Sequence, residues 1–175
     1  ACDFIARLLE KEGVKNYMVE IGGEVTMKGV NQQGDCWRVG INKPEIGTSG
    51  VTNDVEEIVQ LCQKGGVATS GDYRNFYIKD GKKYAHTINP ATGYPAGQNI
   101  LSATIVAEDC MTADAYATTF MVLGVEKAKL LAQSIPKIEY FIIYADNNGQ
   151  QKVTYSKGML EYLPNRKTLA ILENP

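Results

Sequence analysis

Short strand-like runs joined by tight turns constrain the fold of this chain most. Asp80-Gly81 separates two such runs, residues 147–149 (Asn-Asn-Gly) separate two more, and Gly22-Gly23 interrupts a third pair. Turns of this kind favour β-hairpins because Asn, Asp and Gly accept positive φ at low cost. Hairpins join antiparallel strands. We therefore predict an α+β fold with a largely antiparallel sheet and packed helices, not a doubly wound parallel sheet.

Helical patterns are fewer than strand patterns. The predicted helices cover residues 1–13, 110–123 and 125–134, ended by Gly13, Gly124 and Pro136, and the first carries Phe4, Ile5, Leu8 and Leu9 on one face. Asp109 is the expected N-cap of the second helix. Residues 55–62 fit a helix or a strand, and residues 168–172 are expected to form a final strand.

Composition excludes several classes of function. The net charge is -2 and no basic block stands out, so nucleic acid is not an expected partner. No apolar run approaches the roughly 20 residues that span a bilayer. The four cysteines include no C-x-x-C pair and the chain has one histidine, which disfavours a zinc site. Cysteine pairing cannot be decided from the sequence.

The first candidate for chemistry is "GGVATSGDYRNFY", residues 65–77. Small residues around Ser70 and Gly71 could cup an anionic oxygen with backbone N–H groups, and Arg74 could bind one with two hydrogen bonds. The alternative is an Asx-type turn at Asp72 between two strands. Spacing alone favours the turn.

The second candidate lies on the helix at residues 110–123. Asp114 and Thr118 are four residues apart and share one face. A carboxylate and a hydroxyl suit a hard cation such as Mg²⁺, which would keep waters and recruit phosphate oxygens. The alternative is an exposed Asp favoured by the helix dipole. Without further information the alternative is preferred.

The third candidate is "YAHTINPATGYP", which holds the only histidine, His86, before a turn stiffened by two prolines. A neutral imidazole there could move protons or bind a phosphate. A single histidine is more often a hydrogen-bonded structural residue. The segment "IGGE", with Gly22 and Gly23, is similarly a turn by default and otherwise a place where backbone approaches a ligand closely.

The order of these segments is more specific than any one of them. The blocks "NYMVEIGGEV", "WRVGI", "VATSGDYRNFY", "YAHTINPATGYP" and "MTADAYATTFMVLG" together closely resemble the FAD:protein FMN transferase family, the ApbE-like flavin transferases. The resemblance runs to about residue 130 and implies an ApbE-like, T-fold-like architecture. It implies an enzyme that uses Mg²⁺ to transfer the FMN half of FAD to a Thr or Ser hydroxyl of a partner protein, releasing AMP.

The resemblance also implies roles for individual residues. Asp114 and Thr118, with the backbone carbonyl of Ala117, would hold Mg²⁺, and His86 would accept the proton of the attacking hydroxyl. The residues expected at the flavin-diphosphate are Gly22, Gly23, Ser70, Gly71, Asp72, Arg74, His86, Thr87 and Ile88.

Two further expectations concern context. Residues 1–175 match the C-terminal portion of a flavin transferase domain whose relatives carry an N-terminal region with additional flavin and metal contacts. Relatives are usually lipoproteins at the periplasmic face of the bacterial inner membrane and modify flavoprotein subunits of membrane redox complexes. Two alternatives remain, an FAD pyrophosphatase that forms FMN and AMP and a non-catalytic flavin-binding fragment. The oligomeric state stays open, with a homodimer among the options.

Overall fold

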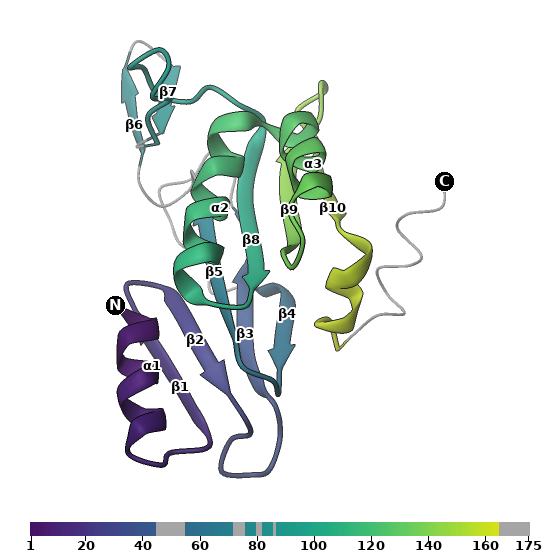
Figure 1. Ribbon diagram of the computed structural model, residues 1–175. Helices are drawn as coiled ribbons and strands as arrows, with labels where there is room; N and C mark the ends of the chain where they lie inside the picture. The colour runs from purple at the N-terminus through teal and green to yellow at the C-terminus, as the bar shows by residue number, and fades with distance from the viewer. Residues whose placement is uncertain (45–54, 72–75, 80–81, 86, 165–175) are drawn as a thin grey trace.

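The structure, a computed structural model, describes residues 1–44, 55–71, 76–79, 82–85 and 87–164. Its centre is a six-stranded sheet in the order β1-β2-β5-β8-β9-β10 (Figure 1). Every neighbouring pair is antiparallel, as the hairpin turns predict. The six strands are β1 (Tyr17–Ile21), β2 (Glu24–Lys28), β5 (Gly65–Gly71), β8 (Ile100–Ala107), β9 (Glu139–Ala145) and β10 (Gln151–Tyr155).

Two further strand pairs lie outside this sheet. β3 (Trp37–Asn42) pairs with β4 (Val55–Leu61), and β6 (Phe76–Lys79) pairs with β7 (Lys82–Ala85) across residues 80–81. The ambiguous segment at residues 55–62 is thus a strand. Its burial alternates from Glu57 to Leu61, which is the period of a strand with one buried face.

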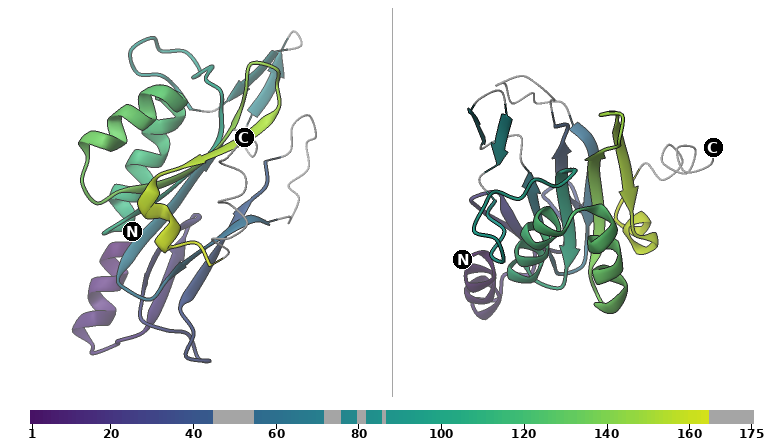
Figure 2. Two further views of the ribbon diagram at one scale, coloured as in Figure 1. Left: turned by 90° about the vertical axis from the view of Figure 1, so that its right-hand side faces the viewer. Right: turned by 90° about the horizontal axis from the view of Figure 1, so that it is seen from above.

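The helices are α1 (Cys2–Lys11), α2 (Cys110–Leu123) and α3 (Val125–Ser134), close to the predicted ranges. They line one side of the six-stranded sheet, as the view from above in Figure 2 shows. A 3-10 helix, η1 (Lys157–Glu161), was not expected from the sequence. The strand predicted at residues 168–172 lies outside the described residues. No helix in the described part of the chain has the length and apolar character to cross a membrane.

The sheet has an apolar core on each face, and alternate residues of one strand feed different cores. Tyr140 and Ile142 of β9 pack with α2 and α3, whereas Phe141 and Ile143 pack with the β3–β4 pair and η1. The six-stranded sheet is therefore the middle of three layers, which explains why its central strands are so apolar.

The ends of α2 follow the local rules. The carboxylate of Asp109 accepts a hydrogen bond from the N–H of Thr112 at 2.7 Å, which confirms the predicted N-cap. Gly124 ends the helix with φ of 77°. In β5, a Cβ at Gly66 would collide with the backbone of Asp109 and Cys110, so glycine allows the start of α2 to approach the strand closely.

One disulfide links the connection before β3 to the connection after β4. Cys36 and Cys62 are bonded, with their Cα atoms 4.5 Å apart, while Cys2 and Cys110 are free and buried. The bridge closes the base of the β3–β4 pair, a pairing that sequence spacing could not decide.

Candidate active site

Helix α2 brings the first two predicted groups together. The hydroxyls of Thr118 on α2 and Ser70 on β5 lie 3.1 Å apart, within hydrogen-bonding distance. Asp114 lies one turn earlier on α2 and is exposed, as is Thr118. Two segments separated by nearly fifty residues thus place a carboxylate and two hydroxyls along one edge of the α2–β5 contact.

The oxygen chemistry of this edge fits a hard cation. Asp114 supplies the carboxylate, Thr118 and Ser70 supply hydroxyls, and Mg²⁺ prefers oxygen ligands. Ala117 is a fully buried residue of α2, and because a methyl group cannot bind a metal, its backbone carbonyl is the only group that it could contribute. Among the described residues no three His, Cys, Asp or Glu side chains cluster around a common point. An ion at Asp114 would therefore need waters or phosphate oxygens as further ligands.

A cavity of about 280 Å³ holds the glycines predicted at the flavin. Gly22 and Gly23 line it from the β1–β2 turn and Gly71 lines it from the end of β5. Gly22 and Gly23 have φ of 74° and 102°, a conformation that side chains disfavour. The backbone is accordingly bare where it faces the cavity.

Strand alternation separates Ser70 from Gly71. Ser70 shares the α2 face of β5 with Gly66 and Ala68, whereas Gly71 shares the opposite face with Thr69. The predicted residues therefore form two groups at the end of β5, one beside α2 and one at the cavity. A ligand that contacts both groups has to cross the end of the strand.

Several cavity residues were missed by sequence reasoning. Val39, Gly40 and Asn42 of β3 and Thr69 of β5 also line the cavity. For Thr69 the alternation of β5 was a usable signal, because it places Thr69 on the face of Gly71. For the residues of β3 there was no such signal, because only tertiary packing brings the β3–β4 pair over the sheet.

A larger cavity of about 490 Å³ lies elsewhere, bordered by residues such as Cys62, Glu108 and Tyr162. It contains none of the predicted site residues. We therefore base the candidate site on the smaller cavity and the α2–β5 edge.

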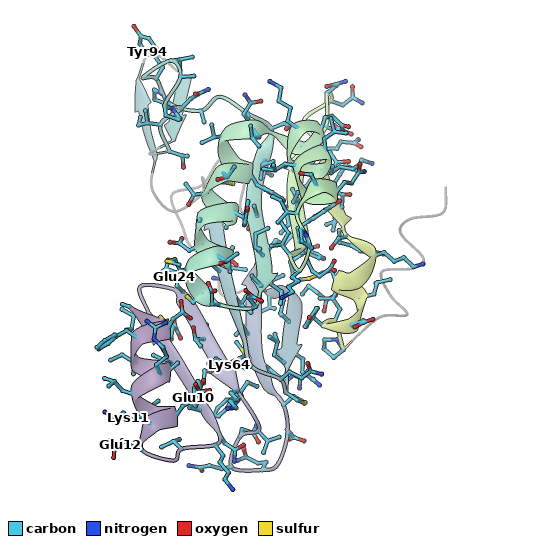
Figure 3. The ribbon with its side chains drawn as sticks, in the orientation of Figure 1. Glu10, Lys11, Glu12, Glu24, Lys64 and Tyr94 are labelled. Atoms are coloured by element: carbon cyan, nitrogen blue, oxygen red, sulfur yellow. A yellow bond between two sulfur atoms is a disulfide. The ribbon has the colours of Figure 1, made fainter. Side chains whose placement is uncertain are left out.

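The loop after His86 is closed by its own hydrogen bonds. The N–H of Asn89 donates to the carbonyl of Tyr94 at 2.9 Å, and the N–H of Ala96 donates to the carbonyl of Thr87 at 2.8 Å. Ile88 pairs with Pro95 and is half exposed, while Thr87 is buried. The prolines and the positive φ of Gly93 thus fix a compact loop that ends in the exposed Tyr94 (Figure 3).

Three predicted residues, Asp72, Arg74 and His86, lie outside the described residues. Their roles remain predictions from the sequence.

The start of α2 carries a second acidic group that the sequence did not reveal. Asp3 of α1 accepts hydrogen bonds from the N–H of Cys110 at 3.0 Å and of Met111 at 2.9 Å, and from the hydroxyl of Thr26 at 2.7 Å. Burial opposes ionisation of Asp3, but these hydrogen bonds outweigh it and lower its pKa.

Cys110, by contrast, is not a candidate nucleophile. Burial, followed by the neighbouring Cys2, raises the pKa of its thiol to about 12. The reactive form of cysteine is the thiolate, so Cys110 is inert at neutral pH.

Taken together, the fold and the site define an α+β protein with oxygen ligands on a helix at one face of β5 and a glycine-lined cavity at the other. The ApbE family model matches residues 1–142, and the chain belongs to the ApbE family. It is 41% identical over 156 residues to the FAD:protein FMN transferase of Vibrio cholerae, covering 88% of this chain and 45% of that protein. It is 44% identical over 129 residues to the FAD:protein FMN transferase of Escherichia coli K12, covering 74% and 35%.

Solved structures agree with this assignment. The flavin transferase ApbE from Vibrio cholerae superimposes with a TM-score of 0.77 at 37% identity, over 93% of this chain and 49% of that one. The ApbE protein from Thermotoga maritima gives a TM-score of 0.73 at 29% identity, over 99% and 50%. These values confirm the predicted family and fold class. The chain spans about half the length of the relatives that it matches.

Proposed function

We propose that this chain contributes to an enzyme that transfers the FMN half of FAD to a Thr or Ser hydroxyl of a partner protein. The observation that carries the proposal is the contact between Thr118 and Ser70, with Asp114 one turn away, in a chain of the ApbE family. The named activity of its relatives supports the choice of FAD as substrate.

In the proposed reaction the hydroxyl oxygen of the acceptor forms a bond to the phosphorus of the FMN half. The bridging P–O bond to the AMP half breaks, and AMP leaves with that oxygen. Mg²⁺ would supply charge neutralisation on the diphosphate. Asp114, Thr118 and the carbonyl of Ala117 would hold the ion, while Gly22, Gly23 and Gly71 leave room for the flavin-diphosphate.

The proton of the attacking hydroxyl needs an acceptor, and we assign it to His86. This role rests on the sequence resemblance, as do the diphosphate contacts of Asp72 and Arg74. His86→Ala is expected to slow transfer by about 100-fold, within the usual range for a general base, without weakening FAD binding to the same degree.

The reaction type is tested by incubating the purified protein with FAD and Mg²⁺, with and without a threonine-bearing acceptor. Transfer gives a covalent FMN adduct on the acceptor, seen as a mass increase, together with AMP. Free FMN formed without acceptor would instead establish the alternative hydrolase. FAD binding with no product under either condition would establish a non-catalytic flavin-binding chain.

The metal role is tested by Asp114→Ala. Even outer-shell partners of metal ligands change metal affinity by about 10–100-fold, so loss of a direct ligand should raise the Mg²⁺ requirement at least as much. Glu126→Gln is the matched control, because it removes an exposed carboxylate from α3 instead. An unaltered Mg²⁺ requirement in Asp114→Ala would remove this residue from the metal site.

We also propose that the protein works in the bacterial cell envelope, at the periplasmic face of the inner membrane. The Cys36–Cys62 disulfide supports an oxidising compartment, because disulfides persist there and are rare in the cytosol. The acceptors would be flavoprotein subunits of membrane redox complexes. Mass spectrometry of protein isolated with its thiols blocked should find Cys36 and Cys62 linked. Two alkylated thiols there would argue against export.

A further inference from the structure

The proposed metal ligands lie on a helix, so their position depends on what fixes that helix along its axis. Two close contacts mark the position of α2 along β5, one near the start of the helix and one two turns later. At the start, Gly66 permits the backbone of Cys110 to approach the strand. Later, Thr118 meets Ser70 at 3.1 Å.

The distance between the two contacts is nearly the same along the strand as along the helix. Four residues of strand from Gly66 to Ser70 span about 13 Å at roughly 3.3 Å per residue. Eight residues of helix from Cys110 to Thr118 span about 12 Å at 1.5 Å per residue. Helix and strand therefore run side by side in register, and a shift of α2 at its start is passed directly to Thr118.

Asp3 is hydrogen-bonded to the start of α2. Its two carboxylate oxygens accept the N–H groups of Cys110 and Met111, which have no partner within α2. The hydroxyl of Thr26, a buried residue of β2, donates to the same carboxylate. Asp3 thus ties the first turn of α2 to α1 and to β2, from a position 107 residues earlier in the chain.

The charge on Asp3 adds to this effect. A helix N-terminus carries partial positive charge, so an ionised carboxylate is favoured there, and hydrogen bonds to a charged acceptor are stronger than neutral ones. Asp109 caps only Thr112 of the same end. The two carboxylates divide the free N–H groups of the first turn between them, and of the two only Asp3 belongs to another element.

We infer that Asp3 is a positioning residue for the metal site, which sets the axial register of α2 on β5 and thereby the placement of Asp114 and Thr118. This inference rests on the proposed function for the identity of the ligands. The register itself does not depend on that proposal. Asp3 is not one of the proposed ligands and would act through α2.

The test compares Asp3→Asn with Glu10→Gln. Asn at position 3 keeps an acceptor of similar size but loses the charge and one of the two accepting oxygens. Glu10 anchors the same helix α1 to Lys28 and Lys64 and makes no hydrogen bond to α2, so its variant loosens α1 without touching the cap. Both proteins are first compared by thermal unfolding, so that a general loss of stability is seen separately.

Metal binding is measured directly, with Mn²⁺ as an oxygen-seeking probe followed by electron paramagnetic resonance. We expect Asp3→Asn to bind Mn²⁺ about tenfold more weakly than wild type, as for outer-shell partners of metal ligands, and Glu10→Gln to bind as wild type does. Equal affinity in Asp3→Asn and wild type would overturn the inference. Equal weakening in both variants would also overturn it, because the effect would then be one of stability.

Amide hydrogen exchange gives a readout that needs no metal. Asp3→Asn should speed exchange at the amides of residues 110–118, whereas Glu10→Gln should leave them protected as in wild type. If exchange became faster only at Cys110 and Met111, Asp3 would be a local cap alone. The inference that Asp3 sets the register of α2 would then be overturned. If wild type itself bound no Mn²⁺, the proposed metal site would fall, and the exchange result would still decide the register.

Discussion

Helices α1 and α2 pack on the same side of the sheet, but they are held there by opposite kinds of contact. Phe120 and Met121 of α2 are almost completely buried. In α1 the buried positions are the small residues Cys2 and Ala6, while Phe4 and Leu8 are 58% and 45% exposed.

What holds α1 to the sheet is mostly polar. Glu10 makes an ion pair with Lys64 at 2.8 Å (Figure 3). It makes a second ion pair with Lys28 at 2.9 Å and accepts a hydrogen bond from Tyr17 at 3.0 Å. Asp3 provides the second anchor, on Thr26 and the start of α2. A strongly amphipathic sequence therefore does not tell which face of a helix is covered. The described residues leave the apolar stripe of α1 largely uncovered.

The largest expected difference between the helices comes from truncating one aromatic side chain in each. Phe120→Ala should lower the free energy of unfolding by about 3–5 kcal/mol, because it empties a fully buried site beside Tyr140. Phe4→Ala should change it by less than about 0.5 kcal/mol, because that ring is mostly exposed. Urea unfolding of the two variants measures both. Similar losses would show that the α1 stripe is covered in the folded protein.

A smaller loss of stability is expected when the side-chain N-cap of α2 is removed. Asp109→Ala should cost about 1 kcal/mol, since the N–H of Thr112 loses its acceptor. Thr119→Ala serves as the control, because its hydroxyl donates only to the carbonyl of Ala115 on the same helix. In thermal unfolding, Asp109→Ala should have a clearly lower melting temperature than Thr119→Ala. Equal melting temperatures would mean that Asp3 alone suffices to cap the helix.

The smallest effect is the acid response of α1. Hydrogen bonds from Lys64 and then Lys28 lower the pKa of Glu10 to about 2, below its ordinary value of 4.5. A lowered pKa in the folded state adds stability that is complete above pH 4.5 and lost as the pH falls toward 2. Glu10→Gln should therefore flatten the fall of melting temperature over this window.

Glu12→Gln is the control for the acid response, since Glu12 lies past the end of α1 and outside these ion pairs. It should retain the wild-type dependence on pH. If the melting temperature of Glu10→Gln fell with pH as steeply as that of wild type, Asp3 and other carboxylates would dominate acid unfolding.

Much of the fold was predictable because it depends on local chemistry. The turns at Gly22-Gly23 and residues 147–149, the N-cap at Asp109 and the stop at Gly124 all require particular residue types at particular dihedral angles. The segment at residues 55–62 could not be resolved locally. It is a strand because pairing with β3 satisfies its backbone and buries alternate side chains.

The candidate site divides in the same way. Sequence order placed Ser70, Asp114 and Thr118 in one family pattern, but only the packing of α2 on β5 brought the hydroxyls of Ser70 and Thr118 to 3.1 Å. The contact of Asp3 with Cys110 and Met111 left no local signal, because the partners are more than a hundred residues apart.

The sequence by itself thus determined the α+β class, the turns, the helix ends and the family. The tertiary structure decided which face of α1 is covered, that Cys36 pairs with Cys62, and which residues of β3 and β5 share a cavity. The physical reason is the distance along the chain over which each feature is determined. Backbone dihedrals and caps depend on a few neighbouring residues, whereas burial, disulfide geometry and the register of helix on strand depend on segments that only folding brings together.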